Sequence, residues 1–129
     1  MPSTPKKPTL LICDDEEGIR ESFKVILSDC YQLRFANHGL DALTLIKASP
    51  VDLLLLDIKM PKMNGMEILK QVKKLKPSLP VIIVTGYKSV EMAQEALRNG
   101  AADYLPKPFD SQHILSAVAA ALKKEGLSR

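Results

Sequence analysis

No stretch of this sequence is apolar for long enough to cross a membrane, because a membrane-spanning helix needs about 18 consecutive apolar residues. Cysteine is also scarce. Cys13 and Cys30 form no Cys-x-x-Cys pair and no Cys/His cluster, and no signal peptide precedes them, which argues against a disulfide framework or a zinc site. We therefore expect a cytoplasmic protein with reduced thiols and no membrane association.

The chain also has no strong excess of charge of one sign. Its formal net charge is +3, which is too small to predict nucleic-acid binding without a basic stripe. Lysines gather only weakly, at Lys70, Lys73, Lys74 and Lys76, and a solvated helix face accounts for them. With 46% hydrophobic and 26% charged residues, the 129 residues suit one core. The sequence predicts a single globular domain that does not bind nucleic acid directly.

Short apolar runs alternate with segments whose apolar residues recur at helical spacing. The predicted strands are Leu10–Cys13, Leu33–Ala36, Val51–Leu56, Val81–Val84 and Ala102–Leu105. The predicted helices carry Ile19–Leu27, Leu40–Ile46, Ile68–Leu75, Val90–Leu97 and Ile114–Leu122. We expect Asn99-Gly100 to close the fourth helix, and Asp110 or Ser111 to cap the fifth. This alternation indicates an α/β protein with a doubly wound parallel sheet.

Both ends of the sequence look different from the middle. Residues 1–8 hold three prolines and two lysines and no core residue, so we expect a disordered tail. Residues 9–124 are expected to form the domain. Residues 125–129 are expected to be a tail or the stub of a linker.

Polar residues stand at the carboxyl ends of the predicted strands, where open α/β sheets bind ligands. Asp57 follows the run Val51–Leu56, which is apolar enough to be buried on both faces. Asp14-Asp15 follow the first strand, Thr85 ends the fourth, and Lys107 follows the fifth. Carboxylates gathered at one point repel each other unless a cation lies among them. Oxygen ligands favour Mg²⁺, and a lysine and a hydroxyl beside a free carboxylate suit phosphoryl transfer to Asp57.

In these features the chain resembles a two-component response-regulator receiver domain of the CheY-like kind, from about Leu10 to Leu122. The matching motifs are Asp14-Asp15, Asp57-x-x-Met60-Pro61-x-x-x-Gly65, Thr85-Gly86, Tyr104 and Lys107-Pro108-Phe109. The resemblance implies a flavodoxin-like fold, a five-stranded sheet in the order 2-1-3-4-5 with five helices. It also implies that a histidine kinase or histidine-phosphotransfer protein supplies a phosphoryl group to Asp57, with Mg²⁺ or Mn²⁺ as cofactor.

The resemblance gives each motif residue a role. Asp15, Asp57 and the backbone carbonyl of Lys59 would bind the metal, and Asp14 would act through metal-bound water or by orienting Lys107. Thr85 and Tyr104 would be the switch pair, and the Lys107-Pro108 peptide bond is expected to be cis. We interpret Glu16 and Glu17 as plain first-turn acids that complement a helix dipole, and Gly65 as a turn glycine.

Three further sets of residues are expected to tune the response. Lys59 and Tyr87 stand two residues beyond Asp57 and Thr85, and they offer no amide or carboxylate to orient an attacking water, so we expect a long-lived aspartyl phosphate. The edge expected to dock the phosphohistidine-bearing helix comprises Gly18, Ile19 and Ser22, although Ile19 is equally well interpreted as core. The expected output surface comprises Glu91, Met92, Glu95, Arg98, Asp103 and Tyr104.

The downstream role stays open at the level of sequence. One reading is a stand-alone receiver of the sporulation-phosphorelay type. The alternative is the receiver of a longer DNA-binding transcription regulator of the nitrogen-regulation type, which would make a phosphorylation-dependent homodimer plausible. A haloacid-dehalogenase-like phosphatase is a remote alternative, because its general acid would have to stand at Lys59. We therefore expect a phosphoacceptor signalling domain, with only self-phosphorylation and slow autodephosphorylation, rather than an enzyme.

Overall fold

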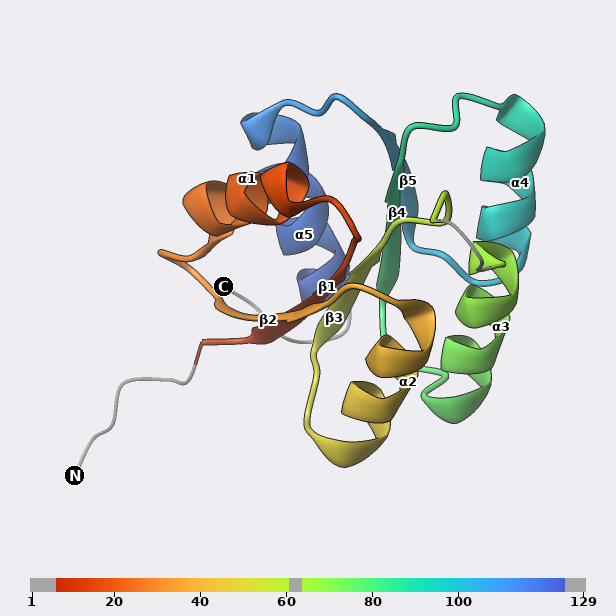
Figure 1. Ribbon diagram of the computed structural model, residues 1–129, viewed down its shortest axis with the longest axis horizontal. Helices are drawn as coiled ribbons and strands as arrows, with labels where there is room; N and C mark the ends of the chain where they lie inside the picture. The colour runs from red at the N-terminus through yellow and green to blue at the C-terminus, as the bar shows by residue number, and fades with distance from the viewer. Residues whose placement is uncertain (1–6, 61–63, 125–129) are drawn as a thin grey trace.

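The computed structural model describes residues 7–60 and 64–124. The strands are β1 (Thr9–Cys13), β2 (Gln32–Ala36), β3 (Leu53–Leu56), β4 (Val81–Thr85) and β5 (Asp103–Pro106). The helices are α1 (Glu17–Leu27), α2 (Gly39–Ala48), α3 (Gly65–Leu75), α4 (Val90–Arg98) and α5 (Ser111–Lys124). The strands form one parallel sheet in the order β2-β1-β3-β4-β5 (Figure 1). The predicted fold is confirmed.

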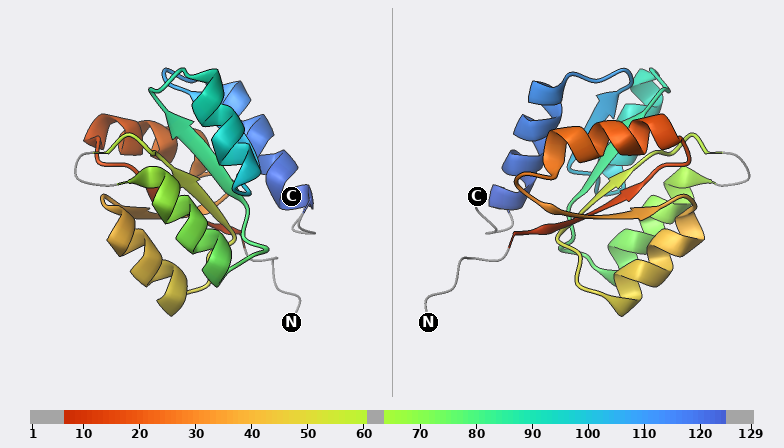
Figure 2. Two further views of the ribbon diagram at one scale, coloured as in Figure 1. Left: turned by 90° about the vertical axis from the view of Figure 1, so that its right-hand side faces the viewer. Right: turned by 60° about the vertical axis from the view of Figure 1, so that its left-hand side comes forward.

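The sheet is the middle layer of three. Helices α1 and α5 cover one face, and α2, α3 and α4 cover the other (Figures 1 and 2). In β1, Leu10 and Ile12 pack with α1 and α5, whereas Leu11 and Cys13 pack with the helices of the opposite face. This alternation follows from the two-residue period of a strand, and burial on both faces explains why β1 and β3 are continuously apolar.

Two strand boundaries differ from the sequence prediction. Strand β3 begins at Leu53 rather than Val51, and the Asp52 carboxylate just before it accepts a hydrogen bond from Thr9 N at 2.8 Å. Strand β5 runs from Asp103 to Pro106, one residue later than predicted. Its hydrogen bonding continues as far as Lys107, whose N–H donates to Thr85 O at 2.8 Å.

Gly65 does not act as the turn glycine that the sequence suggested. It is the first residue of α3, and the Asn64 side chain caps that helix by accepting a hydrogen bond from Glu67 N at 3.2 Å. A Cβ atom at Gly65 would lie 2.4 Å from Ile58 Cα. A glycine is therefore needed where α3 starts against the backbone that follows β3. Pro61 and Met63 lie outside the described residues.

The predicted helix ends are largely confirmed. Gly100 follows α4 with φ +100°, in the left-handed region expected there. Asp110 is the residue that caps α5, since its side chain accepts from Gln112 N at 3.0 Å. A further cap was not predicted: His38 Nδ1 accepts a hydrogen bond from Leu40 N at the start of α2.

Helix α4 is less buried than its apolar spacing predicted. Ala96 is its one fully buried residue, with Met92 packed partly against the core. Val90 and Leu97 are 71% and 50% exposed. The helix covers the part of the sheet beside the edge strand β5 (Figure 1), where less of its circumference meets other elements.

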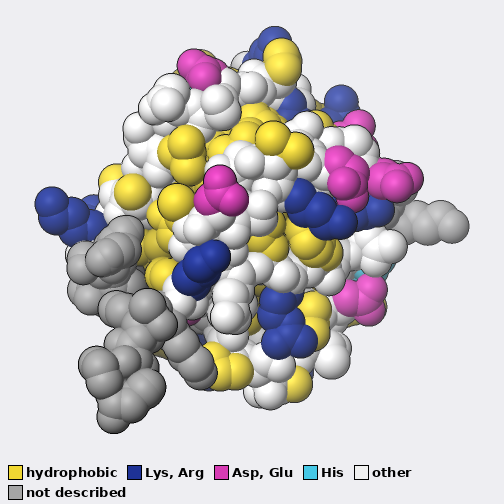
Figure 3. Space-filling view, turned by 90° about the vertical axis from the view of Figure 1, so that its left-hand side faces the viewer, with side chains coloured by type: hydrophobic (Ala, Val, Ile, Leu, Met, Phe, Trp, Pro, Cys, Tyr) yellow, Lys and Arg dark blue, Asp and Glu magenta, His cyan; other side chains and the backbone are white. Residues whose placement is uncertain are grey.

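Among the described residues, no helix is both long and apolar enough to span a membrane. Figure 3 shows a face on which acidic and basic side chains are interspersed rather than separated by sign.

Candidate functional site

The polar residues predicted at strand ends do meet at the carboxyl edge of the sheet. Backbone hydrogen bonds extend the pairing just beyond the strands: Asp14 N donates to Ala36 O and Asp57 N to Cys13 O, each at 3.0 Å. The parallel register therefore places Asp14, Asp57 and Lys107 next to each other, although they are far apart in sequence.

Lys107 is the centre of this site. Its Nζ atom lies 2.8 Å from Asp14 Oδ2, 2.8 Å from Asp57 Oδ2 and 2.9 Å from Glu16 Oε1. The ammonium group is thus surrounded by three carboxylate oxygens, and those of Asp57 and Glu16 accept hydrogen bonds from it. Asp14 and Asp57 are only 2% and 4% exposed, and carboxylates so buried require a cation or hydrogen-bond donors beside them.

The other oxygens of the two buried carboxylates accept backbone hydrogen bonds. Asp57 Oδ1 accepts from Lys59 N at 2.8 Å, and Asp14 Oδ1 accepts from Glu16 N at 2.9 Å. Arg20 Nη1 donates to the Asp14 carbonyl at 2.9 Å. Each carboxylate is thus held in one orientation by its own loop and by Lys107.

The electrostatics reflect this crowding of charges. Burial raises the pKa of Asp14, although hydrogen bonds with Lys107 and with Glu16 N act in the opposite direction. Burial lowers the pKa of Lys107, but its hydrogen bonds with Asp14, Asp57 and Glu16 prevail and raise it above its ordinary value. Burial and the neighbouring carboxylates raise the pKa of the Cys13 thiol to about 12. Cys13 is therefore an inert thiol beneath the site.

Thr85 and Tyr104 both contact the backbone of Tyr87. Thr85 is fully buried, and its Oγ1 accepts a hydrogen bond from Tyr87 N at 3.4 Å. The Tyr104 hydroxyl donates to the Tyr87 carbonyl at 3.0 Å. Burial, with Asp57 and Tyr87 nearby, raises the pKa of Tyr104. The residue pair predicted from sequence is therefore connected through the loop after β4.

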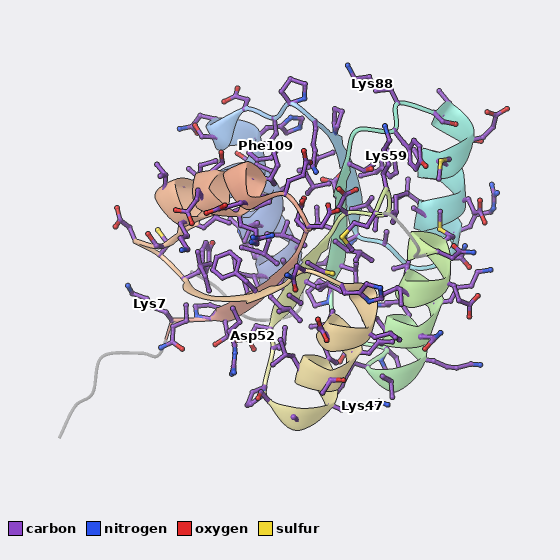
Figure 4. All side chains as sticks on the ribbon, viewed as in Figure 1. Lys7, Lys47, Asp52, Lys59, Lys88 and Phe109 are labelled. Atoms are coloured by element: carbon purple, nitrogen blue, oxygen red, sulfur yellow. The ribbon has the colours of Figure 1, made fainter. Side chains whose placement is uncertain are left out.

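The side chain of Lys59 contacts the ring of Tyr87. The Lys59 ammonium lies 5.2 Å from the centre of the Tyr87 ring, which is within the range of a cation–π interaction. Figure 4 shows Lys59 and Lys88 at the end of the sheet opposite to Lys47 and Asp52. Lys59 also lines a cavity of about 410 Å³. The cavity's other lining residues are Asp15, Glu16, Asp57, Gly86 and Lys107.

The donor set fits a hard divalent cation. Asp14, Glu16 and Asp57 each offer a carboxylate oxygen, and these oxygens lie within 4.8 Å of one another. Such an all-oxygen set suits Mg²⁺ or Mn²⁺. Asp15 is exposed and lines the cavity but is outside this group of three. Glu16, which the sequence suggested was a plain first-turn acid, is inside it.

The structure also places the two expected partner surfaces. On α1, Gly18 and Ser22 are exposed, whereas Ile19 is half-buried and packs against the core between the sheet and α1. On the other side, Glu91 and Arg98 are exposed on α4. The other four members of the expected output surface are half-buried: Met92, Glu95, Asp103 and Tyr104. The expected cis peptide bond between Lys107 and Pro108 is confirmed.

Comparison with known proteins gives a consistent result. Residues 10–119 match the family described as response regulator receiver domain. Among solved structures, a CheY-like receiver domain protein from Methanospirillum hungatei has a TM-score of 0.89 and 34% identity, covering 94% of this chain and 98% of that one. NtrX from Brucella abortus has a TM-score of 0.85 and 34% identity, covering 94% of this chain and 27% of that one.

Curated relatives are longer than this chain. The transcriptional regulatory protein ZraR of Klebsiella oxytoca is 40% identical over 120 residues, which are 92% of this chain and 27% of that protein. The response regulator MprA of Mycobacterium avium is 35% identical over 116 residues, which are 89% of this chain and 51% of that protein. The chain thus spans about a quarter to a half of these relatives, and it belongs to the response regulator receiver domain family of two-component systems.

Proposed function

We propose that this receiver domain accepts a phosphoryl group on Asp57. The observation that carries the proposal is the Asp57 carboxylate itself, almost fully buried at the end of β3 and 2.8 Å from the Lys107 ammonium. It also lines the cavity that opens at the carboxyl edge of the sheet. A carboxylate held beside a cation, and reachable from a cavity, suits nucleophilic attack on phosphorus.

The proposed donor is a phosphohistidine of a histidine kinase or histidine-phosphotransfer protein. An Asp57 oxygen attacks phosphorus, a P–O bond forms, and the P–N bond to the histidine breaks. The electron pair of that bond returns to the imidazole, which leaves and can take up a proton. Lys107 donates a hydrogen bond to a phosphoryl oxygen and offsets its negative charge, and Thr85 donates another. The product is an acyl phosphate on Asp57.

We propose Mg²⁺, or Mn²⁺, as the cofactor. By resemblance to receivers, Asp15, Asp57 and the Lys59 carbonyl would hold it, with Asp14 acting through bound water. The carboxylate cluster supports the proposal because its oxygens converge and its acidic residues outnumber the single lysine among them. The cation supplies positive charge for the phosphoryl oxygens. The protein's own part is to hold Asp57 in one orientation through Lys59 N.

The proposed switch uses Thr85 and Tyr104. A phosphate on Asp57 offers new acceptor oxygens to the Thr85 hydroxyl. Any movement of Thr85 acts on Tyr87 N and so on the Tyr104 hydroxyl, which binds the Tyr87 carbonyl. The population then shifts between two packings of α4 and β5. The output surface is proposed as before, at Glu91, Met92, Glu95, Arg98, Asp103 and Tyr104.

Two roles downstream of the phosphorylated domain are proposed, and the longer relatives favour one of them. The matched residues make up 27% of ZraR, which is named a transcriptional regulatory protein. This favours the receiver of a longer DNA-binding regulator, with a phosphorylation-dependent homodimer, over a stand-alone relay protein. Light scattering with Mg²⁺, with and without beryllofluoride, separates them: a dimer that requires the mimic supports the regulator, and a monomer with mimic bound supports the relay.

The phosphoacceptor proposal is tested with a small-molecule phosphodonor such as acetyl phosphate. Intact-mass spectrometry with Mg²⁺ should show addition of one phosphoryl group, which Asp57→Asn and removal of the cation by EDTA should both abolish. Asp52→Asn, at the other end of the sheet, is the matched control and should be phosphorylated like the unchanged protein. Equal labelling of the Asp57→Asn variant would contradict the proposal.

A further inference from the structure

Glu16 stands at the start of α1 but does not cap that helix. It is the N-cap residue of α1, yet its side chain makes no capping hydrogen bond. Its Oε1 atom instead accepts a hydrogen bond from Lys107 Nζ at 2.9 Å. The backbone is fixed on both sides, because Glu16 N donates to Asp14 Oδ1 and Glu16 O accepts from Arg20 N. The side chain is thus directed at Lys107 and not at its own helix.

The three acceptors of Lys107 are not equivalent. The side chains of Asp14 and Asp57 are 2% and 3% exposed, whereas that of Glu16 is 61% exposed. Glu16 also lines the cavity, together with Asp57 and Lys107. Since three carboxylate oxygens already surround the ammonium group, an oxygen that approaches Lys107 from the cavity competes with them and is bound best when one of them gives way. The exposed acceptor is the one that solvent can most readily replace.

We propose that Glu16 is a positioning residue for Lys107: it holds the ammonium group toward the cavity and is the acceptor that a phosphoryl oxygen replaces. The inference rests on the proposed phosphoacceptor function and adds a residue to it. Because the Glu16 contact exists before the phosphoryl group arrives and is lost afterwards, it stabilises the unphosphorylated state. Removing it should therefore strengthen the binding of a phosphoryl mimic once Mg²⁺ is saturating.

Three variants separate positioning from charge. Glu16→Gln removes the negative charge and weakens the contact with Lys107. Glu16→Asp keeps the charge but is one methylene shorter, and aspartate is a favoured N-cap residue that would bind its own helix instead. Glu17→Gln removes the neighbouring exposed acid, which starts the same helix, and serves as the matched control.

The first readout is hydrogen exchange of the Lys107 ammonium group, followed by nitrogen-15 NMR in the metal-free protein. Exchange should be about twofold to fivefold faster in both Glu16 variants, the range expected for an exposed ion pair. The second readout is beryllofluoride affinity at saturating Mg²⁺. It should be higher in both variants by about the same twofold to fivefold factor. Glu17→Gln should match the unchanged protein in both.

The outcomes distinguish this inference from the function on which it rests. If Glu16→Asp matches the unchanged protein and only Glu16→Gln differs, charge alone is responsible and the positioning role is wrong. Unchanged exchange and affinity in both variants would also overturn it. If beryllofluoride fails to bind even the unchanged protein, the phosphoacceptor function fails, whereas faster Lys107 exchange in both variants would still support the Glu16 contact.

Discussion

The contact between Lys59 and Tyr87 predicts how long a phosphoryl group would stay on Asp57. The Lys59 ammonium lies 5.2 Å from the ring centre of Tyr87, which is 37% exposed. Lys59 lines the cavity beside Asp57, and its backbone N–H binds Asp57 Oδ1. We expect the water that hydrolyses the acyl phosphate to approach Asp57 past this pair. Neither side chain carries a carboxylate or an amide that would orient the water for attack.

The size of the effect follows from the interaction itself. A cation–π contact at an exposed position contributes about 0.5–1 kcal/mol, which corresponds to about twofold to fivefold in rate if the contact must open before hydrolysis. Tyr87→Ala should therefore shorten the phosphoryl lifetime by about that factor. Lys59→Asn combined with Tyr87→Glu should shorten it further, because the new side chains can also orient the attacking water.

The assay is the decay of the phosphorylated species in Mg²⁺ after the small phosphodonor is removed, followed by intact-mass spectrometry. Tyr87→Phe is the matched control, since it keeps the ring, the contact with Lys59 and the backbone groups that bind Thr85 and Tyr104. Its lifetime should equal that of the unchanged protein. A double variant whose lifetime is also unchanged would refute the reasoning, because the pair would then not control access to Asp57.

Three other predictions follow from the contacts. Tyr104→Ala should leave phosphorylation of Asp57 intact but abolish phosphate-dependent partner binding, and a variant that still binds in a phosphate-dependent way would disprove the switch. Burial raises the pKa of Asp14 above its usual 3.8, so ionisation of this carboxyl costs stability progressively as the pH rises from 3.8 to the higher folded-state pKa. Asp14→Asn should therefore raise the metal-free melting temperature at pH 7, with the gain vanishing below pH 3.8. Gly65→Ala should cost about 1–3 kcal/mol in urea unfolding through its clash with Ile58, whereas Gly18→Ala, which meets no atom within 4 Å, should cost nothing.

The fold was predictable because the pattern that encodes it is simple. A strand buried on both faces has to be continuously apolar, and the runs of β1, β3 and β4 are. The helices between these strands could be predicted because their apolar residues recur at helical spacing. The spacing does not predict how deeply each apolar side chain is buried. Val90 and Leu97 fit the apolar face of α4, yet both are exposed, because burial of a helix residue depends on how much of the sheet lies beneath it.

The candidate site was predictable in its position and only partly in its contacts. Residues at strand ends converge in any parallel sheet, so Asp14, Asp57, Thr85 and Lys107 could be grouped from sequence. Glu16 could not, because it stands in a run of four acids and the first turn of a helix favours acids in any case. The distinguishing feature is the absence of a capping bond, which depends on the side-chain rotamer and on the reach of Lys107.

Tyr87 connects the two properties that a receiver must balance, the lifetime of its phosphoryl group and the state of its output surface. Its N–H binds the Thr85 hydroxyl, its carbonyl accepts from Tyr104, and its ring faces Lys59. Movement of Thr85 toward a phosphate would pull on the same backbone that carries the Tyr87 ring against Lys59. Stabilities of linked contacts are coupled in both directions. A partner that holds Tyr104 on the Tyr87 carbonyl should therefore also slow hydrolysis at Asp57.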